Sequence, residues 1–360
     1  MKMILIILLC SLPLTIGLIG CDDDNKNDAD KDGDSGATTD SATDTDSNVG
    51  TDSNSENDSN TNVDTDTPSE TELANSCPDI TDESQPGVAK LLEYSVFSFV
   101  EMGVWDNYYY FRKDNKLQRI NLDDLTTEEI EETIGHVSEL IGDTFFWTEK
   151  DETDTYIIKS APVSDATNVT IVASGTRLPR FIGTHDGYLY LLFKDDFEIA
   201  RAPLTGGDIV TFLPEVDPLG IIVHDGYIWW QDFTRESLNR TSLSGDTGER
   251  ESLTGIFYGG ALAGEGDTMY WTDYSLGTIE KWDADNGRVQ LTGASADLLV
   301  VMDGTLYWPN GFGNASINSM KTDGSELKKL FCGFHSVDNL WTTGRYLVAS
   351  TSEGVFKIDI

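Results

Sequence analysis

A short phrase of aromatic residues, preceded by a tight turn, recurs along this chain from about residue 106 onward. The clearest copies occupy residues 266–273 and 303–310. Taking the last aromatic or apolar residue of each copy as a marker gives seven positions 36 to 44 residues apart, which are Phe111, Trp147, Leu191, Trp230, Trp271, Trp308 and Val348. A period near 40 residues is typical of β-propeller blades and too long for leucine-rich or hexapeptide solenoids.

A second marker recurs in step with the first. A basic residue follows the aromatic marker by 8 to 12 positions in six copies, as Arg119, Lys159, Arg201, Arg240, Lys281 and Lys357, and Ser319 takes its place in the sixth copy. Two independent features with the same period indicate a true structural repeat.

Each repeat divides into short β segments separated by turn residues. In the sixth copy these segments are 298–302, 305–308, 315–320 and 327–331, and Asp303-Gly304 between the first two favours a tight hairpin. The acidic stretch 128–132 is predicted as the fourth strand of the first repeat. Four strands per repeat predict an all-β propeller with seven four-stranded blades, six blades being the alternative.

The last repeat holds only three predicted strands, at 339–341, 345–350 and 355–360. A strand at 87–94 is therefore expected to supply its missing outer edge, because closing the ring removes exposed sheet edges.

The sequence Tyr270-Trp271-Thr272-Asp273 resembles the YWTD repeat of the low-density-lipoprotein receptor class B propellers. The resemblance extends over residues from about 95 to 360, although only this copy carries the whole motif. It implies that the aromatic pair packs between blades and that the Asp hydrogen-bonds to a neighbouring blade. Members of that family have six blades, which is why six remains the alternative.

The first twenty residues carry one charge, Lys2, and an apolar run that ends in small residues before Cys21. Such a run is typical of a cleaved export signal. Leu18-Ile19-Gly20-Cys21 is similar to the lipobox of bacterial lipoproteins, which implies cleavage before Cys21 and lipid attachment to its sulfur. Residues 1–20 are thus the expected signal peptide, and the protein is expected in the cell envelope, anchored to a membrane outside the cytoplasm.

Residues 22–76 are almost entirely Asp, Ser, Thr, Asn and Gly, with 17 acidic residues against Lys26 and Lys31. Such a segment buries too little apolar surface to fold, so 21–76 is predicted to be a lipidated, disordered linker. Asp28-x-Asp30-x-Asp32-Gly33 matches the first half of an EF-hand loop, but Thr39 stands where the bidentate Glu is required. We therefore interpret the segment as a spacer.

The predicted propeller, 77–360, carries 46 acidic and 21 basic residues, which argues against nucleic acid as a partner. Cys10 lies in the signal and Cys21 takes the lipid, which leaves Cys77 and Cys332. Because the protein is exported, these two are predicted to form a disulfide.

Residues that would indicate catalysis are sparse. His136, His185, His224 and His335 have no metal-ligand or catalytic spacing, and neither a nucleophile elbow nor a phosphate-binding loop is present. Trp147, Trp230, Trp271 and Trp308 are expected to pack between blades rather than to stack on sugars. The predicted inner strands 181–184, 221–223, 261–263 and 298–302 are mostly apolar or small, which argues against a catalytic channel and against a bound cofactor or metal.

Three charged residues fall near the starts of inner strands, and they are the only ligand-binding candidates, namely Arg180, Asp297 and Asp338. The leading functional hypothesis is a noncatalytic, lipid-anchored propeller that binds a protein or polysaccharide in the cell envelope, since loops on a rigid scaffold commonly carry recognition. The alternative is a metal-dependent hydrolase or lactonase acting in the propeller channel.

Overall fold

The computed structural model describes residues 77, 79, 86–93, 99–114, 116–130, 138–255, 259–294, 296–310 and 315–360. The predicted signal peptide, Cys21 and the acidic linker lie outside the described residues. Within the described part, no helix is long and apolar enough to cross a membrane. The one helix described there is a single 3₁₀ turn, η2 (Lys194–Asp196).

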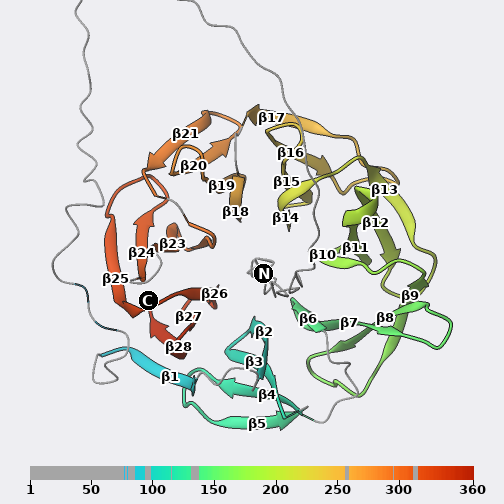
Figure 1. Cartoon of the computed structure of the whole chain (residues 1–360), viewed down its shortest axis with the longest axis horizontal. Coiled ribbons are helices and arrows are strands. Elements are labelled where there is room, and N and C mark those ends of the chain that lie inside the picture. The colour runs from blue at the N-terminus through green and yellow to red at the C-terminus, as the bar shows by residue number, and fades with distance from the viewer. Residues whose placement is uncertain are drawn as a thin grey trace, which may run out of the picture. The chain divides into compact units, whose positions relative to one another are not determined.

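Seven antiparallel four-stranded sheets form a ring (Figure 1), which confirms the prediction of seven blades. Six blades follow the chain in order, each running from the inner to the outer strand. Blade 1 consists of β2 (Phe99–Trp105), β3 (Tyr108–Lys113), β4 (Lys116–Asn121) and β5 (Thr127–Ile130). Blade 2 consists of β6 (Ser138–Ile141), β7 (Thr144–Lys150), β8 (Tyr156–Pro162) and β9 (Thr170–Gly175). Blade 3 consists of β10 (Arg180–His185), β11 (Tyr188–Phe193), β12 (Glu198–Pro203) and β13 (Val210–Pro214).

The second half of the ring repeats this order. Blade 4 consists of β14 (Pro218–His224), β15 (Tyr227–Asp232), β16 (Ser237–Ser242) and β17 (Glu251–Gly255). Blade 5 consists of β18 (Gly259–Glu265), β19 (Thr268–Asp273), β20 (Thr278–Asp283) and β21 (Gly287–Thr292). Blade 6 consists of β22 (Val300–Met302), β23 (Thr305–Asn310), β24 (Ala315–Lys321) and β25 (Lys328–Phe334). Blade 7 combines β26 (Val337–Thr342), β27 (Tyr346–Thr351) and β28 (Gly354–Asp359) with β1 (Val88–Glu93).

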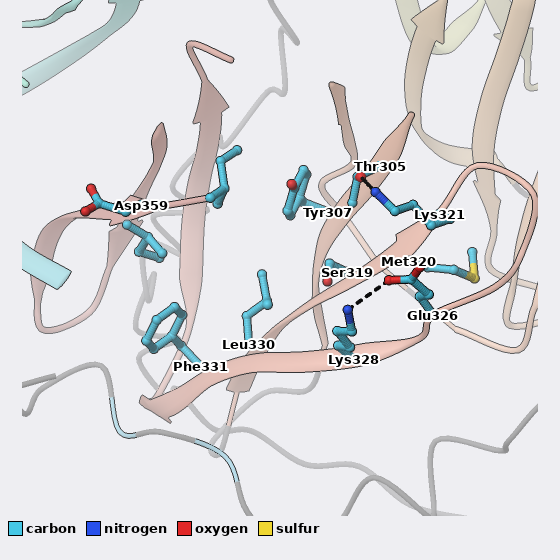
Figure 2. Close-up of a pocket in the computed structure, with 12 residues that line it drawn as sticks. Thr305, Tyr307, Ser319, Met320, Lys321, Glu326, Lys328, Leu330, Phe331 and Asp359 are labelled. Atoms are coloured by element: carbon cyan, nitrogen blue, oxygen red, sulfur yellow. Dashed lines mark hydrogen bonds and ion pairs between the residues drawn. The ribbon is translucent and has the colours of Figure 1, made fainter. Parts of the chain in front are cut away.

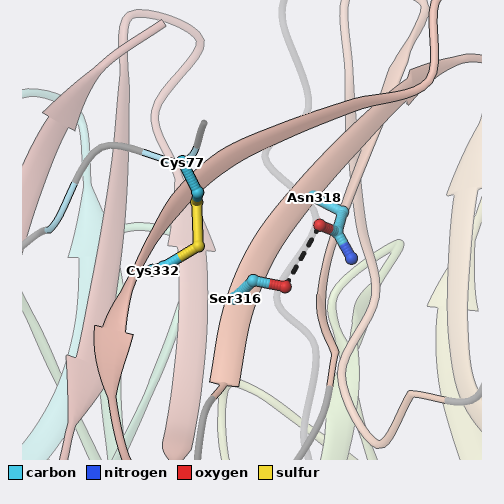
Figure 3. The surroundings of a disulfide bond; sticks show 4 residues. All are labelled: Cys77, Ser316, Asn318 and Cys332. Atoms are coloured by element: carbon cyan, nitrogen blue, oxygen red, sulfur yellow. Dashed lines mark hydrogen bonds between the residues drawn. A yellow bond between two sulfur atoms is a disulfide. The ribbon is translucent and has the colours of Figure 1, made fainter. Parts of the chain in front are cut away.

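The expected ring closure is present, because β1 pairs antiparallel with β28 as the outer strand of blade 7. Cys77 and Cys332 are joined by a disulfide with their Cα atoms 5.8 Å apart (Figure 3). Asp79 also forms a β-bridge with Cys332 of β25, the outer strand of blade 6. The segment leading into β1 is thereby attached to the neighbouring blade at the point where the ring closes.

The recurring tryptophans are core residues, as predicted. Trp147, Trp230, Trp271 and Trp308 are fully buried, and each belongs to an apolar cluster that includes residues of the preceding blade. Trp308 of β23, for example, shares a cluster with Ala261 and Tyr270 of blade 5. The repeat therefore supplies the interface between blades, which is the part of the fold that buries most aromatic surface.

The aspartate of the Tyr-Trp-Thr-Asp phrase differs from what the YWTD resemblance implies. Asp273 is buried, and its Oδ1 accepts hydrogen bonds from Ser275 and Leu276 in the turn of its own blade. The bond to the neighbouring blade is made by Arg288 of β21, which donates to the Gly255 carbonyl of blade 4 and lies 3.5 Å from Asp273 Oδ2. The carboxylate of Asp273 thus acts on the preceding blade, blade 4, through an arginine rather than directly.

The recurring basic residues also contact aromatic rings. The guanidinium groups of Arg119, Arg201 and Arg240 lie 4.3, 4.3 and 4.6 Å from the ring centroids of Tyr108, Tyr188 and Tyr227, each on the second strand of the same blade. This arrangement explains the second sequence marker, because a cation over an aromatic face is favourable.

Blade 2 departs from the pattern. Lys159 pairs with Trp147 in the β7–β8 ladder and its Nζ lies 2.6 Å from a carboxylate oxygen of Glu149. In blades 3 and 4 the basic residue instead pairs with the residue before the marker. Lys159 is therefore not structurally equivalent to the other basic residues, and Ser160 is the residue at their place in this blade.

Candidate functional site

The three candidate residues from the sequence all lie where inner strands begin. Arg180 is the first residue of β10, Asp338 is the second residue of β26, and Asp297 precedes β22 by three positions. Because the blades repeat one topology, the inner strands all begin on one face of the ring, which we call the entry face. The entry face also carries the turns between the second and third strands of each blade.

These three residues come from blades 3, 6 and 7 and contact different partners. Tyr274 of blade 5 donates a hydrogen bond to Asp297, and Ser336 donates to Asp338 Oδ1 at 3.2 Å. Arg180 contributes a positive charge beside Glu139 of β6. The grouping of Arg180, Asp297 and Asp338 into a single site stays a prediction.

Two glutamates on inner strands were missed by the sequence reasoning. Glu101 of β2 accepts a hydrogen bond from Asn339 Nδ2 of blade 7 at 2.6 Å, and burial raises the pKa of its carboxyl. The negative charge of Asp338 raises it further, while hydrogen bonds from Ser350 and Asn339 act in the opposite direction. The carboxyl group thus links blades 1 and 7 at the inner edge of the ring.

Glu139 is the more perturbed of the two. Burial raises the pKa of its carboxyl from 4.5 to about 8, and the nearby Arg180 guanidinium only partly offsets this. Its Oε2 is buried without a hydrogen-bond partner, although the residue as a whole keeps some exposure. A carboxyl group in this setting is protonated at neutral pH, so it can donate a hydrogen bond as well as accept one.

A sequence signal for Glu139 did exist. Glu139 pairs with Phe146, and the residues at the equivalent pairing position of the other blades are small or apolar, including Gly103, Gly183 and Ala263. The inner strands of blades 3 to 6 are apolar or small as expected, but those of blades 1 and 2 carry Glu101 and Glu139. The sequence prediction of an apolar or small channel wall covered blades 3 to 6 and did not extend to these two blades.

The histidines of blades 3 and 4 contact neighbouring turns. His224 Nε2 lies 2.8 Å from the Gly266 carbonyl of blade 5, and His185 Nε2 lies 3.4 Å from Asp186 Oδ2. Across the described ranges, no group of three or more His, Cys, Asp or Glu residues is arranged to hold a metal ion. His136 lies outside those ranges.

A feature that the sequence did not reveal is a set of exposed apolar side chains on the entry face of blades 3 to 5. They are between 43% and 62% exposed and comprise Leu178, Phe197, Leu219, Phe233 and Leu276. Phe197, Phe233 and Leu276 occupy the turns between second and third strands, and Leu178 and Leu219 lie at the entrances to β10 and β14. We refer to these five residues as the apolar face set.

The charges beside the apolar face set are mostly acidic. Arg177 lies 3.0 Å from Asp196 Oδ2 and 2.7 Å from Glu198 Oε2, and Arg235 lies 3.2 Å from Glu215 Oε2, so these cations are already neutralised. The face therefore combines exposed apolar groups with a negative border.

The architecture defines the chain as a seven-bladed β-propeller with a disulfide at the ring closure. No protein-family model matches the sequence, and a search of curated protein sequences finds no match either.

Similar folds occur among solved structures. Virginiamycin B lyase from Staphylococcus aureus is 12% identical at a TM-score of 0.56, over 76% of this chain and 99% of that one. The computationally designed protein Ika8 is 10% identical at a TM-score of 0.51, over 75% and 99%. A chain of a nidogen/laminin complex is 15% identical at a TM-score of 0.44, over 65% and 92%. At such low identity the likeness establishes the propeller fold alone.

Proposed function

We propose that this protein is an exported lipoprotein whose propeller binds a protein partner in the cell envelope. In this proposal residues 1–20 are a cleaved signal, Cys21 carries the lipid, the acidic segment up to residue 76 is a spacer, and 77–360 form the binding domain. The anchor holds the propeller to a membrane outside the cytoplasm, and the spacer allows the propeller to bind at a distance from that membrane.

The observation that carries the binding role is the apolar face set. Large apolar side chains scattered singly over a surface are ordinary, but five on one face of three consecutive blades are a feature of recognition surfaces. Phe197, Phe233 and Leu276 lie in turns held by rigid sheets, so little conformational entropy is lost when a partner covers them. A protein is favoured over a polysaccharide because the tryptophans that could have stacked on sugars are buried.

The expected partner has an apolar patch bordered by Lys or Arg. The propeller carries 46 acidic and 21 basic residues, and Arg177 and Arg235 on this face are already paired with carboxylates. A basic border would be attracted to the remaining acidic groups and would speed association. In this proposal Arg180, Asp297 and Asp338 add polar contacts at the inner edge of the same face.

Affinity capture with proximity cross-linking tests the binding proposal. The full chain would be compared with a triple variant, Phe197→Asn, Phe233→Ser and Leu276→Ser, in intact envelopes. Asn suits position 197, where φ is 53°. The matched control carries Ile171→Ser and Val210→Ser, which remove equally exposed apolar groups from an outer strand of blades 2 and 3.

One cross-linked protein should be recovered with the wild type and the control and be lost with the triple variant. Equal recovery with all three variants would show that the apolar face set does not bind the partner. The anchor is tested separately, by mass spectrometry of the mature N-terminus and by fractionation of Cys21→Ala. An unmodified Cys21 at the mature N-terminus would refute lipid attachment.

A further inference from the structure

A cavity of about 210 Å³ lies between blades 6 and 7, on the outer part of the ring (Figure 2). One wall is formed by β23, β24 and β25 of blade 6, and the other by the end of β28 in blade 7. Its lining combines apolar groups, several hydroxyl groups, two lysines and two carboxylates, including Leu330, Phe331, Ile358, Ser319, Lys321 and Lys328.

The first cause of the cavity is a missing side chain. In blades 3 and 5 the recurring cation reaches into the next blade, where Arg201 donates to the Gly245 carbonyl at 2.6 Å and Lys281 donates to the Thr322 carbonyl at 3.4 Å. Ser319 occupies this place in blade 6, opposite Tyr307. A buried serine leaves empty the volume that a long basic side chain fills in other blades.

The second cause is a missing turn. The carbonyl groups of Gly245 and Thr322 lie in turns that connect the third and fourth strands of a blade. Blade 7 has no such turn, because its third strand is β28 whereas its fourth strand, β1, comes from the beginning of the propeller.

Blade 2 shows that both causes are needed. It also has a serine, Ser160, at the cation position, but there the turn of blade 3 places Leu204 and Ile209 against the apolar cluster that contains Phe146. Among the blade boundaries in the described ranges, the one between blades 6 and 7 lacks both the cation and the covering turn.

The charges around the cavity favour an anion. Glu326 lies 2.9 Å from Lys328 Nζ, and Asp359 lies 3.0 Å from Lys357 Nζ, so both carboxylates are neutralised. Lys321 takes part in no ion pair with another described residue. Its Nζ donates to Thr305 Oγ1 at 3.0 Å, which leaves further N–H donors on the same group. Figure 2 shows Lys321 on the same side of the cavity as Thr305.

We propose that this cavity binds a small amphipathic carboxylate, with the carboxylate at Lys321 Nζ and the Ser319 hydroxyl and the hydrocarbon part against Leu330, Phe331 and Ile358. The site is separate from the apolar face set, so binding at one does not depend on the other. A pocket with apolar walls and a few convergent polar groups is the usual form of a small-molecule site.

Calorimetric titration with octanoate tests the proposal, and octylammonium serves as the probe of opposite charge. The chain from residue 21 onward would carry Cys21→Ala, so that neither the signal peptide nor a lipid calls for detergent. Octanoate should bind to this protein more tightly than octylammonium. Lys321→Gln should weaken octanoate at least about tenfold, as expected for the loss of a charge-assisted hydrogen bond. Ser319→Arg, which restores the cation of the other blades, should abolish binding.

Two control variants test whether a change in octanoate binding comes from the cavity or from the altered charge alone. Ser244→Arg and Lys116→Gln make the same changes at exposed positions and should leave octanoate binding unchanged. The proposal is overturned by an absence of octanoate binding at millimolar concentration, by equal binding of octylammonium, or by binding that survives both Lys321→Gln and Ser319→Arg.

Discussion

Replacing Arg288 with methionine should lower the free energy of unfolding by about 4 kcal/mol. Arg288 neutralises two carboxylates that are almost inaccessible to solvent, since Asp273 is 0% and Glu280 is 1% exposed. Its Nη2 lies 2.8 Å from Glu280 Oε1 and 3.5 Å from Asp273 Oδ2. Removing one partner of a buried ion pair costs about 3 to 5 kcal/mol, because the remaining charge stays desolvated. The loss of the hydrogen bond to the Gly255 carbonyl adds to this cost.

A double-mutant cycle separates the charge effect from lost packing. Asp273→Asn keeps the acceptor that caps the turn at Ser275 but removes the negative charge facing Arg288. In the Arg288→Met background this second substitution should therefore restore at least about 1 kcal/mol, whereas alone it should destabilise. Urea unfolding followed by tryptophan fluorescence gives all four free energies.

Lys116→Met is the control, because the Lys116–Glu129 pair is exposed and worth less than about 1 kcal/mol. A loss below about 1 kcal/mol for Arg288→Met, or strict additivity of the two substitutions, would refute the assignment of Arg288 as the counter-ion of buried carboxylates.

Three further outcomes are expected. The pKa of Glu139 is about 8 in the folded protein and 4.5 is its ordinary value, so the folded protein retains a proton that the unfolded chain loses. Stability should therefore fall as the pH rises between these values. Glu139→Gln should reduce this pH dependence of the melting temperature. Trp308→Ala should lower the free energy of unfolding in urea by about 3 to 5 kcal/mol, while Phe197→Ala, at a half-exposed position, should lower it by less than about 1 kcal/mol. Similar losses for the two variants would contradict the inter-blade role of Trp308. Cys77→Ser should cost about 2 to 5 kcal/mol, and peptide mapping without reduction should recover the Cys77–Cys332 pair.

Most of the fold could be predicted from local patterns. The turn at Asp303-Gly304 has φ of 48° and 72°, as a tight hairpin requires, and the strands on either side follow from period-two alternation. Repetition of this unit places the marker tryptophans, such as Trp271, on the same strand and on the interface with the preceding blade, whereas the marker Val348 packs against the following blade, blade 1. Ring closure by β1 was also predictable, since the last repeat is one strand short and a free edge must be covered.

The candidate sites could be predicted only in part. Arg180 and Asp338 lie at the starts of inner strands as expected, but the sequence offered no means of relating them to Glu139 and Glu101. Glu101 lies beside a β-bulge of a kind that also occurs in β10 and β26, and Glu139 lies at a position that is small or apolar in the other blades. The pattern misassigned Lys159 for a different reason, because a one-residue change in register turns a side chain to the other face of a strand.

The amino-acid sequence by itself predicted the strands and the burial of the repeated aromatics and favoured seven blades over six, because these depend on the order of neighbouring residues and on a period that is preserved along the chain. The tertiary structure alone decided which side chains from different blades meet. The serine at position 319 was visible as an exception, yet it produces a cavity only because the adjoining blade is built from both ends of the propeller and lacks a covering turn. The exposure of the apolar face set was likewise decided by the positions of the turns of three blades in the assembled propeller, and no local sequence pattern predicts those positions.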